Sequence, residues 1–217
     1  MGKNVERTLI ALNTLTLGVV LVLALRPGGL LRVTFDTWQT NRAIERTLAS
    51  EWDTMIASGS RLDRSPSKAV LVEFSDYQCP FCKKAHHAID SLIRENGELG
   101  IVYRHFPLPS HQSAAGAARA SVCAANQGRF REMDRRLFET TQWQTDTQWV
   151  REARAVRVPD ISLFRACLTS QATADRVALD MALARRLRIA GTPMFVARSG
   201  LVLGAQPKEA LLALLAR

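Results

Sequence analysis

Cys79 and Cys82, separated by two residues, are the side chains of this sequence whose type and spacing most directly suggest chemistry. On a helix the two sulfur atoms lie one turn apart, close enough to form and break a disulfide. Pro80 follows the first cysteine, and proline suits the first position of a helix, where its missing N–H costs nothing. The unpaired N–H groups at a helix start stabilise a thiolate, so we expect the pKa of Cys79 to be low.

Half of a zinc site has the same spacing, and this alternative requires a second close pair of ligands. The other two cysteines, Cys123 and Cys167, are too far apart in the sequence to form such a pair locally. His86 and His87 are nearer, but they belong to the helix that follows the first two cysteines. Redox chemistry is therefore preferred over metal binding, and no metal is expected.

Hydrophobic periodicity predicts the elements that position this cysteine pair. Strands are predicted at 69–74, 101–106, 194–197 and 201–203. A helix follows the cysteine pair, the pattern from 113 to about 187 is almost wholly helical with a break near Val158-Pro159, and Pro207 opens a last helix. The order β-α-β, helical insert, β-β-α predicts an α/β protein, a thioredoxin fold with an inserted helical domain.

The N-terminus contains 18 uncharged residues, Thr8–Leu25, rich in leucine, valine and alanine. A helix of this length spans roughly 27 Å, just enough for the hydrocarbon core of a bilayer. Arg26-Pro27 follows directly, with no small-x-small cleavage site, so a transmembrane anchor over residues 1–32 is preferred. A cleaved signal peptide and a buried helix remain open. Either membrane interpretation places the remainder outside the cytoplasm, in the periplasm or cell envelope, where disulfides persist.

Residues 33–65 are predicted to form a connecting helix and linker. One face of this helix repeats an apolar residue every four positions, at Ile44, Leu48, Trp52 and Ile56. Gly59-Ser60 and the Ser-Pro-Ser run at 65–67 then break the pattern.

The formal net charge of +9 raises the question of nucleic-acid binding. The basic residues are spread along the chain and often stand beside acidic ones, as in Arg131-Glu132 and Arg151-Glu152. No basic run is interleaved with aromatic residues, so a solvated surface near an anionic membrane is preferred. Nucleic acid is not expected as a partner.

Several segments together resemble the DsbA-like thiol-disulfide oxidoreductases of the thioredoxin superfamily. They are Val72-Glu73-Phe74-Ser75-Asp76-Tyr77-Gln78-Cys79-Pro80-Phe81-Cys82, Phe164-Arg165-Ala166-Cys167-Leu168, Gly191-Thr192-Pro193 and Gly204-Ala205-Gln206-Pro207. The resemblance covers roughly residues 66–217, with the helical insert at about 111–188. It implies an enzyme whose only redox group is the Cys79–Cys82 disulfide, without a further cofactor.

The resemblance also implies roles for single residues. Cys79 would be the exposed nucleophile that forms a mixed disulfide, and Cys82 the buried partner that resolves it. Glu73 would be a buried acid that moves protons at Cys82, although a glutamate facing solvent at a strand edge remains open. Thr192-Pro193 would be a cis peptide bond facing the cysteines, with the Thr192 backbone able to pair with an extended substrate; an ordinary trans-proline is the alternative.

Pro80 and Phe81, between the two cysteines, are expected to tune the redox properties. The best-known oxidants of the family carry histidine where Phe81 stands, and phenylalanine cannot donate a hydrogen bond to the thiolate. We therefore expect a less depressed pKa for Cys79 and a milder oxidant. For Cys123 and Cys167 a structural disulfide is preferred, while two buried thiols or an electron-relaying pair remain open.

The preferred function is an extracytoplasmic oxidase that forms disulfides in cysteine-containing exported proteins and is reoxidised by a membrane redox partner. A membrane-tethered thiol reductase and a non-enzymatic chaperone or binding module are the alternatives. The sequence does not determine the direction of electron flow, the protein substrates or the oligomeric state.

Overall fold

The computed structural model describes residues 16–17, 19–62 and 69–216, and the chain divides into two compact units, Met1–Arg46 and Thr47–Arg217. Helix α2, Leu30–Ala57, begins in the first unit and ends in the second. The predicted domain boundaries at 32/33 and 65/66 differ from this division. The physical reason is that Leu48, Trp52 and Met55, on the second half of α2, are buried in the core of the second unit, which we call the main domain.

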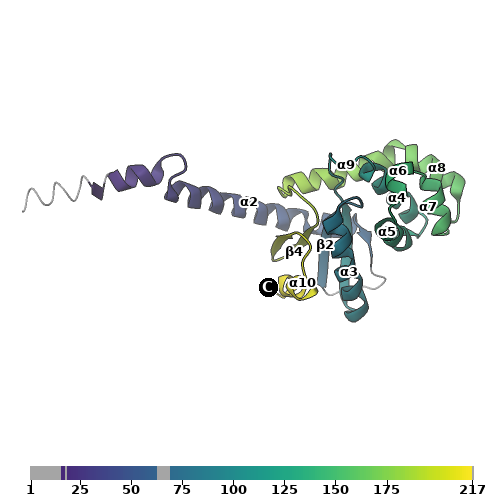
Figure 1. Ribbon diagram of the computed structural model, residues 1–217. Coiled ribbons are helices and arrows are strands. Elements are labelled where there is room, and N and C mark those ends of the chain that lie inside the picture. The colour runs from purple at the N-terminus through teal and green to yellow at the C-terminus, as the bar shows by residue number, and fades with distance from the viewer. Residues whose placement is uncertain (1–15, 18, 63–68, 217) are drawn as a thin grey trace, which may run out of the picture. The chain divides into compact units, whose positions relative to one another are not determined.

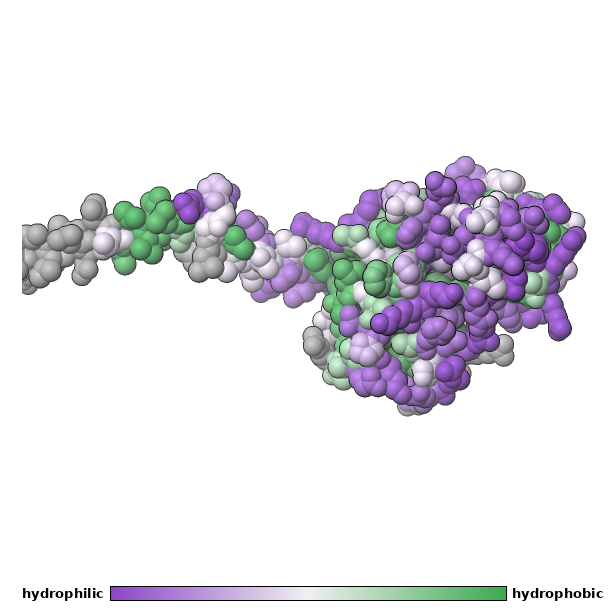
Figure 2. All heavy atoms as spheres, viewed as in Figure 1, coloured by the Kyte–Doolittle hydropathy of each residue, from purple (hydrophilic) through white to green (hydrophobic). Residues whose placement is uncertain are grey.

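Most of the predicted N-terminal anchor lies outside the described residues. Its described end, at 19–25, is helical and bears mostly exposed apolar side chains (Figure 2). Within the part of the chain that the structure describes, no helix combines the length and the apolar character needed to cross a membrane.

A five-stranded sheet forms the centre of the main domain, in the order β1-β3-β2-β4-β5. The strands are β1 (Ser60–Arg61), β2 (Ala69–Ser75), β3 (Leu99–His105), β4 (Met194–Ala197) and β5 (Gly200–Leu203). β2 and β3 are parallel, whereas the other pairs are antiparallel. Four strands lie within two residues of their predicted bounds, but β1 falls in the predicted linker, where two residues are too few to show a pattern.

Successive side chains of the central strands point to opposite faces of the sheet. On one face, Leu71 and Tyr103 pack with the helices α3 (Pro80–Glu95) and α10 (Lys208–Leu215). On the other face, Val72 and Val102 pack with the second half of α2. This alternation places Glu73, two residues after Leu71, on the α3 face.

The insert between β3 and β4 consists of six helices in the described chain, and Figure 1 shows the first five gathered to one side of the sheet. They are α4 (Ala114–Ala125), α5 (Phe130–Glu139), α6 (Trp143–Asp146), α7 (Trp149–Ala155), α8 (Ile161–Thr169) and α9 (Gln171–Arg186). The predicted break near Val158-Pro159 separates α7 from α8. Further turns, such as the one at Gly128 with φ of 70°, separate the helices but leave the apolar repeat of the sequence unbroken.

Arg104, on the α2 face of β3, ties that helix to the sheet. Its guanidinium donates to the Thr54 carbonyl at 2.7 Å and, through Nε, to the Met55 carbonyl at 3.0 Å. These carbonyls belong to the last turn of α2, where few helical N–H groups remain to satisfy them; the Thr54 carbonyl also accepts from the Ser58 N–H at 3.2 Å. The same guanidinium donates to the buried Asp180 at 2.6 Å.

The sheet, the helices on its two faces and the insert together make the domain a thioredoxin-like α/β fold with a helical insert, as predicted.

Candidate active site

The cysteine pair lies where the sequence places it, at the start of α3. Cys79 is the residue before the helix, with extended backbone angles, and Pro80 is its first residue. Both cysteines are free thiols. The exposed Cys79 that the resemblance implies is only 4 % exposed, because the loop at Thr192 lies against it, whereas the neighbouring Phe81 is 62 % exposed. Phe81 is therefore far more accessible to an approaching molecule than Cys79 is.

The two thiols differ strongly in acidity. The hydrogen bond from the Cys82 thiol, with further help from the side chain of Thr192 and the backbone of the helix start, lowers the pKa of Cys79 to about 5 against the effect of burial. Burial, the interaction with Cys79 and the charge of Glu73 raise the pKa of Cys82 far above its ordinary value. At neutral pH the dithiol therefore carries one negative charge, on Cys79.

Glu73 is buried on the dithiol face, with 2 % of its surface exposed. It pairs in register with Tyr103 of β3 and Phe195 of β4 and so occupies the middle of the sheet, not a strand edge facing solvent. Burial raises the pKa of this carboxyl to about 7, opposed in part by the Ser75 hydroxyl. A carboxyl of this pKa exchanges its proton readily near neutral pH.

The Thr192–Pro193 peptide bond is cis. When Cys79 is protonated, its thiol donates to the Thr192 carbonyl, with 3.5 Å between sulfur and oxygen. The Pro193 carbonyl accepts a hydrogen bond from the Gly204 N–H at 2.8 Å, which fixes the loop to the end of β5. The structure thus brings together Cys79, Cys82, Glu73, Thr192 and Pro193, from three segments far apart in the sequence.

Asp76 organises the loop between β2 and α3, a role that the sequence analysis did not identify. Its carboxylate accepts hydrogen bonds from the N–H groups of Gln78 and Leu108, both at 2.7 Å, and lies 2.8 Å from Nδ1 of His111. The Asp76 N–H points to the Cys82 sulfur at 3.5 Å. An aspartate that bonds to an N–H two residues ahead is a common turn signal, and it could have indicated this residue.

Cys123 and Cys167 form a disulfide that joins α4 to α8. Cys123 is completely buried, and Cys167 is half-buried with its sulfur 3.2 Å from the Thr173 hydroxyl. Of the alternatives left open by the sequence, the two unpaired thiols are excluded in this structure. The disulfide links two helices of the insert and is separate from the dithiol.

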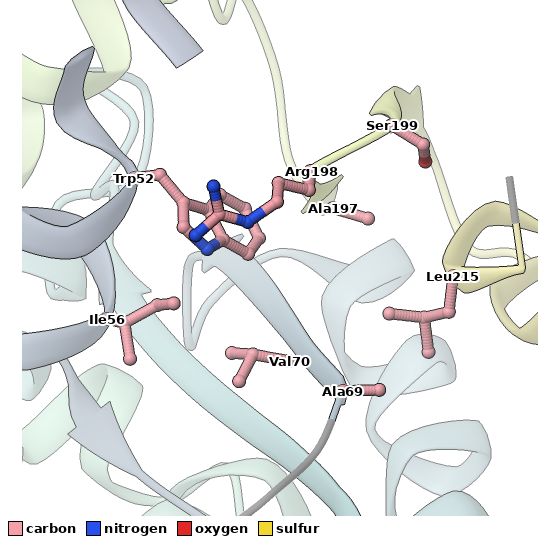
Figure 3. Close-up of a pocket in the computed structure, with 8 residues that line it drawn as sticks. All are labelled: Trp52, Ile56, Ala69, Val70, Ala197, Arg198, Ser199 and Leu215. Carbon is pink, nitrogen blue, oxygen red and sulfur yellow. The ribbon is translucent and has the colours of Figure 1, made fainter. Parts of the chain in front are cut away.

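A metal centre and a ligand pocket are the other kinds of site that the described part of the chain could contain. There, no group of three or more His, Cys, Asp or Glu side chains is placed to hold a metal ion. A pocket of about 600 Å³ lies at the beginning of β2, lined by Trp52, Ile56, Ala69, Val70, Ala197, Arg198, Ser199 and Leu215 (Figure 3). Since the cysteine pair follows the other end of β2, this pocket includes none of the predicted site residues.

Comparison with known proteins bears out the resemblance. The family described as DSBA-like thioredoxin domain matches residues 70–216. The chain belongs to this family. A thioredoxin-like oxidoreductase from Silicibacter pomeroyi DSS-3 shares 28% sequence identity, with a TM-score of 0.68 over 74% of this chain and 92% of that one. The main domain is accordingly a thiol-disulfide oxidoreductase domain.

Two further matches are limited, one by its low sequence identity and the other by its short length. A linker-deletion mutant of ScsC from Proteus mirabilis has a TM-score of 0.74 over 100% of this chain and 95% of that one, but 21% identity, so it shows the fold alone. The Na(+)/H(+) antiporter NhaA 1 of Mycolicibacterium vanbaalenii is 47% identical over 88 residues. That match covers 40% of this chain and 14% of the antiporter, so the DSBA-like chain spans a small part of the curated relative's length.

Proposed function

We propose that this DSBA-like protein oxidises pairs of thiols in exported proteins outside the cytoplasm. The observation that carries the proposal is the opposite acidity of the two active-site thiols. A pKa of about 5 makes Cys79 a stable thiolate and hence a good leaving group, while Cys82 remains a thiol. A stabilised thiolate favours the reduced form, which makes the disulfide form a stronger oxidant.

The reaction begins with the Cys79–Cys82 disulfide. A substrate thiolate attacks the Cys79 sulfur, the bond to Cys82 breaks, and Cys82 leaves with the electron pair and takes up a proton. A second substrate thiolate then attacks the substrate sulfur of the mixed disulfide, and Cys79 leaves as the thiolate. The substrate gains one disulfide, and two electrons remain on the dithiol. A membrane redox partner would remove these electrons and complete the cycle.

The substrate would lie along the loop at Thr192 and Pro193. The Thr192 backbone is next to the Cys79 sulfur and can pair with an extended chain, while Pro193 offers no N–H to the sulfur atoms. Phe81, which is largely exposed, gives the bound chain an apolar contact. The absence of histidine at this position supports a milder oxidant than the best-known members of the family.

We further propose that the segment Thr8–Leu25 tethers the domain to the membrane. Its uncharged length and the exposed apolar side chains at its described end support this. Detergent-free fractionation of the full chain tests the tether, since the protein is expected in the membrane fraction after a high-salt wash. Recovery in the soluble fraction would contradict it.

The direction of electron flow is tested by equilibrating the protein with glutathione buffers and by two assays of turnover. The proposal expects a reduction potential well above about −270 mV, the value of thioredoxin, together with faster oxidative refolding of a reduced protein than insulin reduction. A potential at or below that of thioredoxin would instead support a reductase. Cys79→Ser is the control, because an oxidase loses activity whereas a chaperone would keep its effect on refolding yield.

A further inference from the structure

A line of buried polar side chains runs from Glu73 towards the surface on the α3 face of the sheet. Tyr103 pairs with Glu73 in the strand register, and its ring stacks on Tyr77 with 5.2 Å between ring centres and 12° between ring planes. The Tyr77 hydroxyl donates to the Asp134 carboxyl at 3.2 Å and lies 2.8 Å from the Ser121 hydroxyl. Strand β3, the active-site loop and α5 thus contribute one group each.

The line continues from Asp134 to solvent through helix α3. The second carboxyl oxygen of Asp134 is 3.4 Å from Nδ1 of His86. The other ring nitrogen of His86 is 3.7 Å from the Asp90 carboxylate, whose side chain is 18% exposed. These separations exceed a good hydrogen bond, so a proton crosses them when side chains shift or when water bridges them.

Four atoms along this line have no hydrogen-bond partner in the described part of the chain. They are Glu73 Oε1, Tyr103 Oη, Asp134 Oδ2 and His86 Nε2, all buried. Buried polar groups that serve structure alone are normally satisfied, and exceptions call for an explanation. These four atoms belong to groups that can each release or accept a proton and that come from neighbouring segments. The other unpartnered buried side-chain atoms of the described chain belong to Ser75, His105 and Thr192.

The ionisation of these groups suits a path for protons. Burial, and then the charge of Glu73, raises the pKa of Asp134 well above its ordinary value, which favours the protonated form of this carboxyl. Burial lowers the pKa of His86 to about 4, so its ring is neutral. The titratable and charged neighbours of His86 outside the line itself come from α3 and α5: Asp90, His87, Arg135 and Arg131. Both shifts favour the uncharged form of the group, which limits the buried charge between Asp134 and His86.

Disulfide exchange requires such a path, because the proton that reaches Cys82 has to come from water. Cys82 is completely buried and Glu73 almost so. When the disulfide opens, Cys82 leaves with the electron pair and takes a proton from Glu73, whose carboxylate is then left ionised in the interior. Oxidation of the dithiol reverses each transfer. Glu73 must therefore exchange a proton with solvent once in each half of the cycle.

We propose that Asp134, together with Tyr77, Tyr103 and His86, relays protons between Glu73 and the solvent at Asp90. The proton passes from water to His86, from there to Asp134, and through the two tyrosine hydroxyls to Glu73, so that one proton enters the line for each proton delivered to Cys82. The inference rests on the proposed function, since it assigns a role within the same exchange reaction.

The test compares single turnovers of the full-length, oxidised protein with dithiothreitol, followed by acid quench and mass spectrometry between pH 5 and pH 9. Asp134→Asn keeps the shape and the contact to Tyr77 but removes the acid, and Tyr77→Phe removes the hydroxyl while keeping the ring. Each is expected to slow disulfide opening by about tenfold, to shift the pH profile and to introduce a solvent deuterium isotope effect that the wild type lacks.

Ser121→Ala is the matched control, because it removes the other hydrogen bond of Tyr77 without removing a group of the line. It is expected to react at the wild-type rate. Wild-type rates, pH profiles and isotope effects in both Asp134→Asn and Tyr77→Phe would overturn the relay, as would an equal slowing in Ser121→Ala. If Asp134→Asn does not fold, the rate, pH profile and isotope effect of Tyr77→Phe alone test the relay. Failure of the proposed function is distinguishable, because the wild type would then not exchange disulfides at all.

Discussion

Replacing Glu73 with glutamine removes a buried carboxyl whose proton affinity differs between the folded and unfolded chain. Burial raises its pKa from 4.5 to about 7 in the folded protein. Glutamine has nearly the same shape but does not titrate. The substitution therefore isolates the contribution of this one group to the pH dependence of stability.

The direction follows from proton linkage. Below about pH 4.5 the carboxyl is protonated in both states and contributes no pH-dependent term. Between about pH 4.5 and pH 7 the unfolded chain loses the proton while the folded protein keeps it, so the free energy of unfolding of the wild type falls as the pH rises. A shift of about 2.5 units at roughly 1.4 kcal/mol per unit gives a loss of about 3.5 kcal/mol, complete near pH 8.

The expected result is that Glu73→Gln and the wild type differ little at pH 4, whereas the variant gains about 3.5 kcal/mol relative to the wild type at pH 8. The assay is urea unfolding of both proteins with the Cys79–Cys82 dithiol kept reduced, measured at several pH values. Groups that do not interact with Glu73 titrate equally in both proteins, so they cancel in the difference.

Two results would refute this reasoning. A difference in unfolding free energy that does not change between pH 4 and pH 8 would mean that Glu73 titrates normally, as a solvent-facing glutamate does. A gain for the wild type on raising the pH would mean that the folded protein stabilises the carboxylate. Ser75→Ala removes the hydroxyl that lowers the pKa of Glu73 but keeps the carboxyl, so it should retain the pH dependence that Glu73→Gln removes.

Three further predictions concern other parts of the domain. The ultraviolet absorbance of the Cys79 thiolate should titrate with a midpoint near 5, and a midpoint above about 8 would show an unperturbed thiol. Replacing Cys123 and Cys167 together with alanine opens a loop of 44 residues, so urea unfolding should show a loss of up to about 4 kcal/mol while dithiol exchange persists; loss of exchange would point to an electron-relaying pair. Arg104→Met removes a buried donor from two carbonyls and a buried cation from Asp180, which keeps its contact with the partly exposed Arg176. It should cost about 3 kcal/mol, whereas the exposed Arg186→Met should cost less than about 1 kcal/mol; equal costs would contradict the anchoring role.

Local sequence patterns were sufficient for the elements that carry the dithiol. A short apolar run before Cys79 and Pro80 after it predicts a strand followed by a helix, and both lie where they were predicted. The pattern did not show β1, because its two residues pair through the backbone and need no side-chain alternation. It also did not show the short turns of the insert, which leave the apolar period of neighbouring helices unbroken.

Local patterns also missed the residues that support the site from outside its motif. Asp76 holds the active-site loop through N–H groups that come from positions up to 32 residues away. Tyr77 and Asp134, 57 residues apart, meet because α5 packs beside the active-site loop. No spacing rule connects such residues, since the insert decides which of its side chains reach the α3 face.

The sequence by itself determined the reacting sulfur atoms, the helix start that stabilises the Cys79 thiolate, and the family to which the chain belongs. These depend on neighbours within a turn or on motifs with fixed spacing. Only the tertiary structure decided that Glu73 lies buried under the dithiol, that Thr192 covers Cys79, and that Asp134 connects to Tyr77. The reason is that burial and electrostatic environment arise where separate segments pack together, and these two quantities set the pKa values on which the chemistry depends.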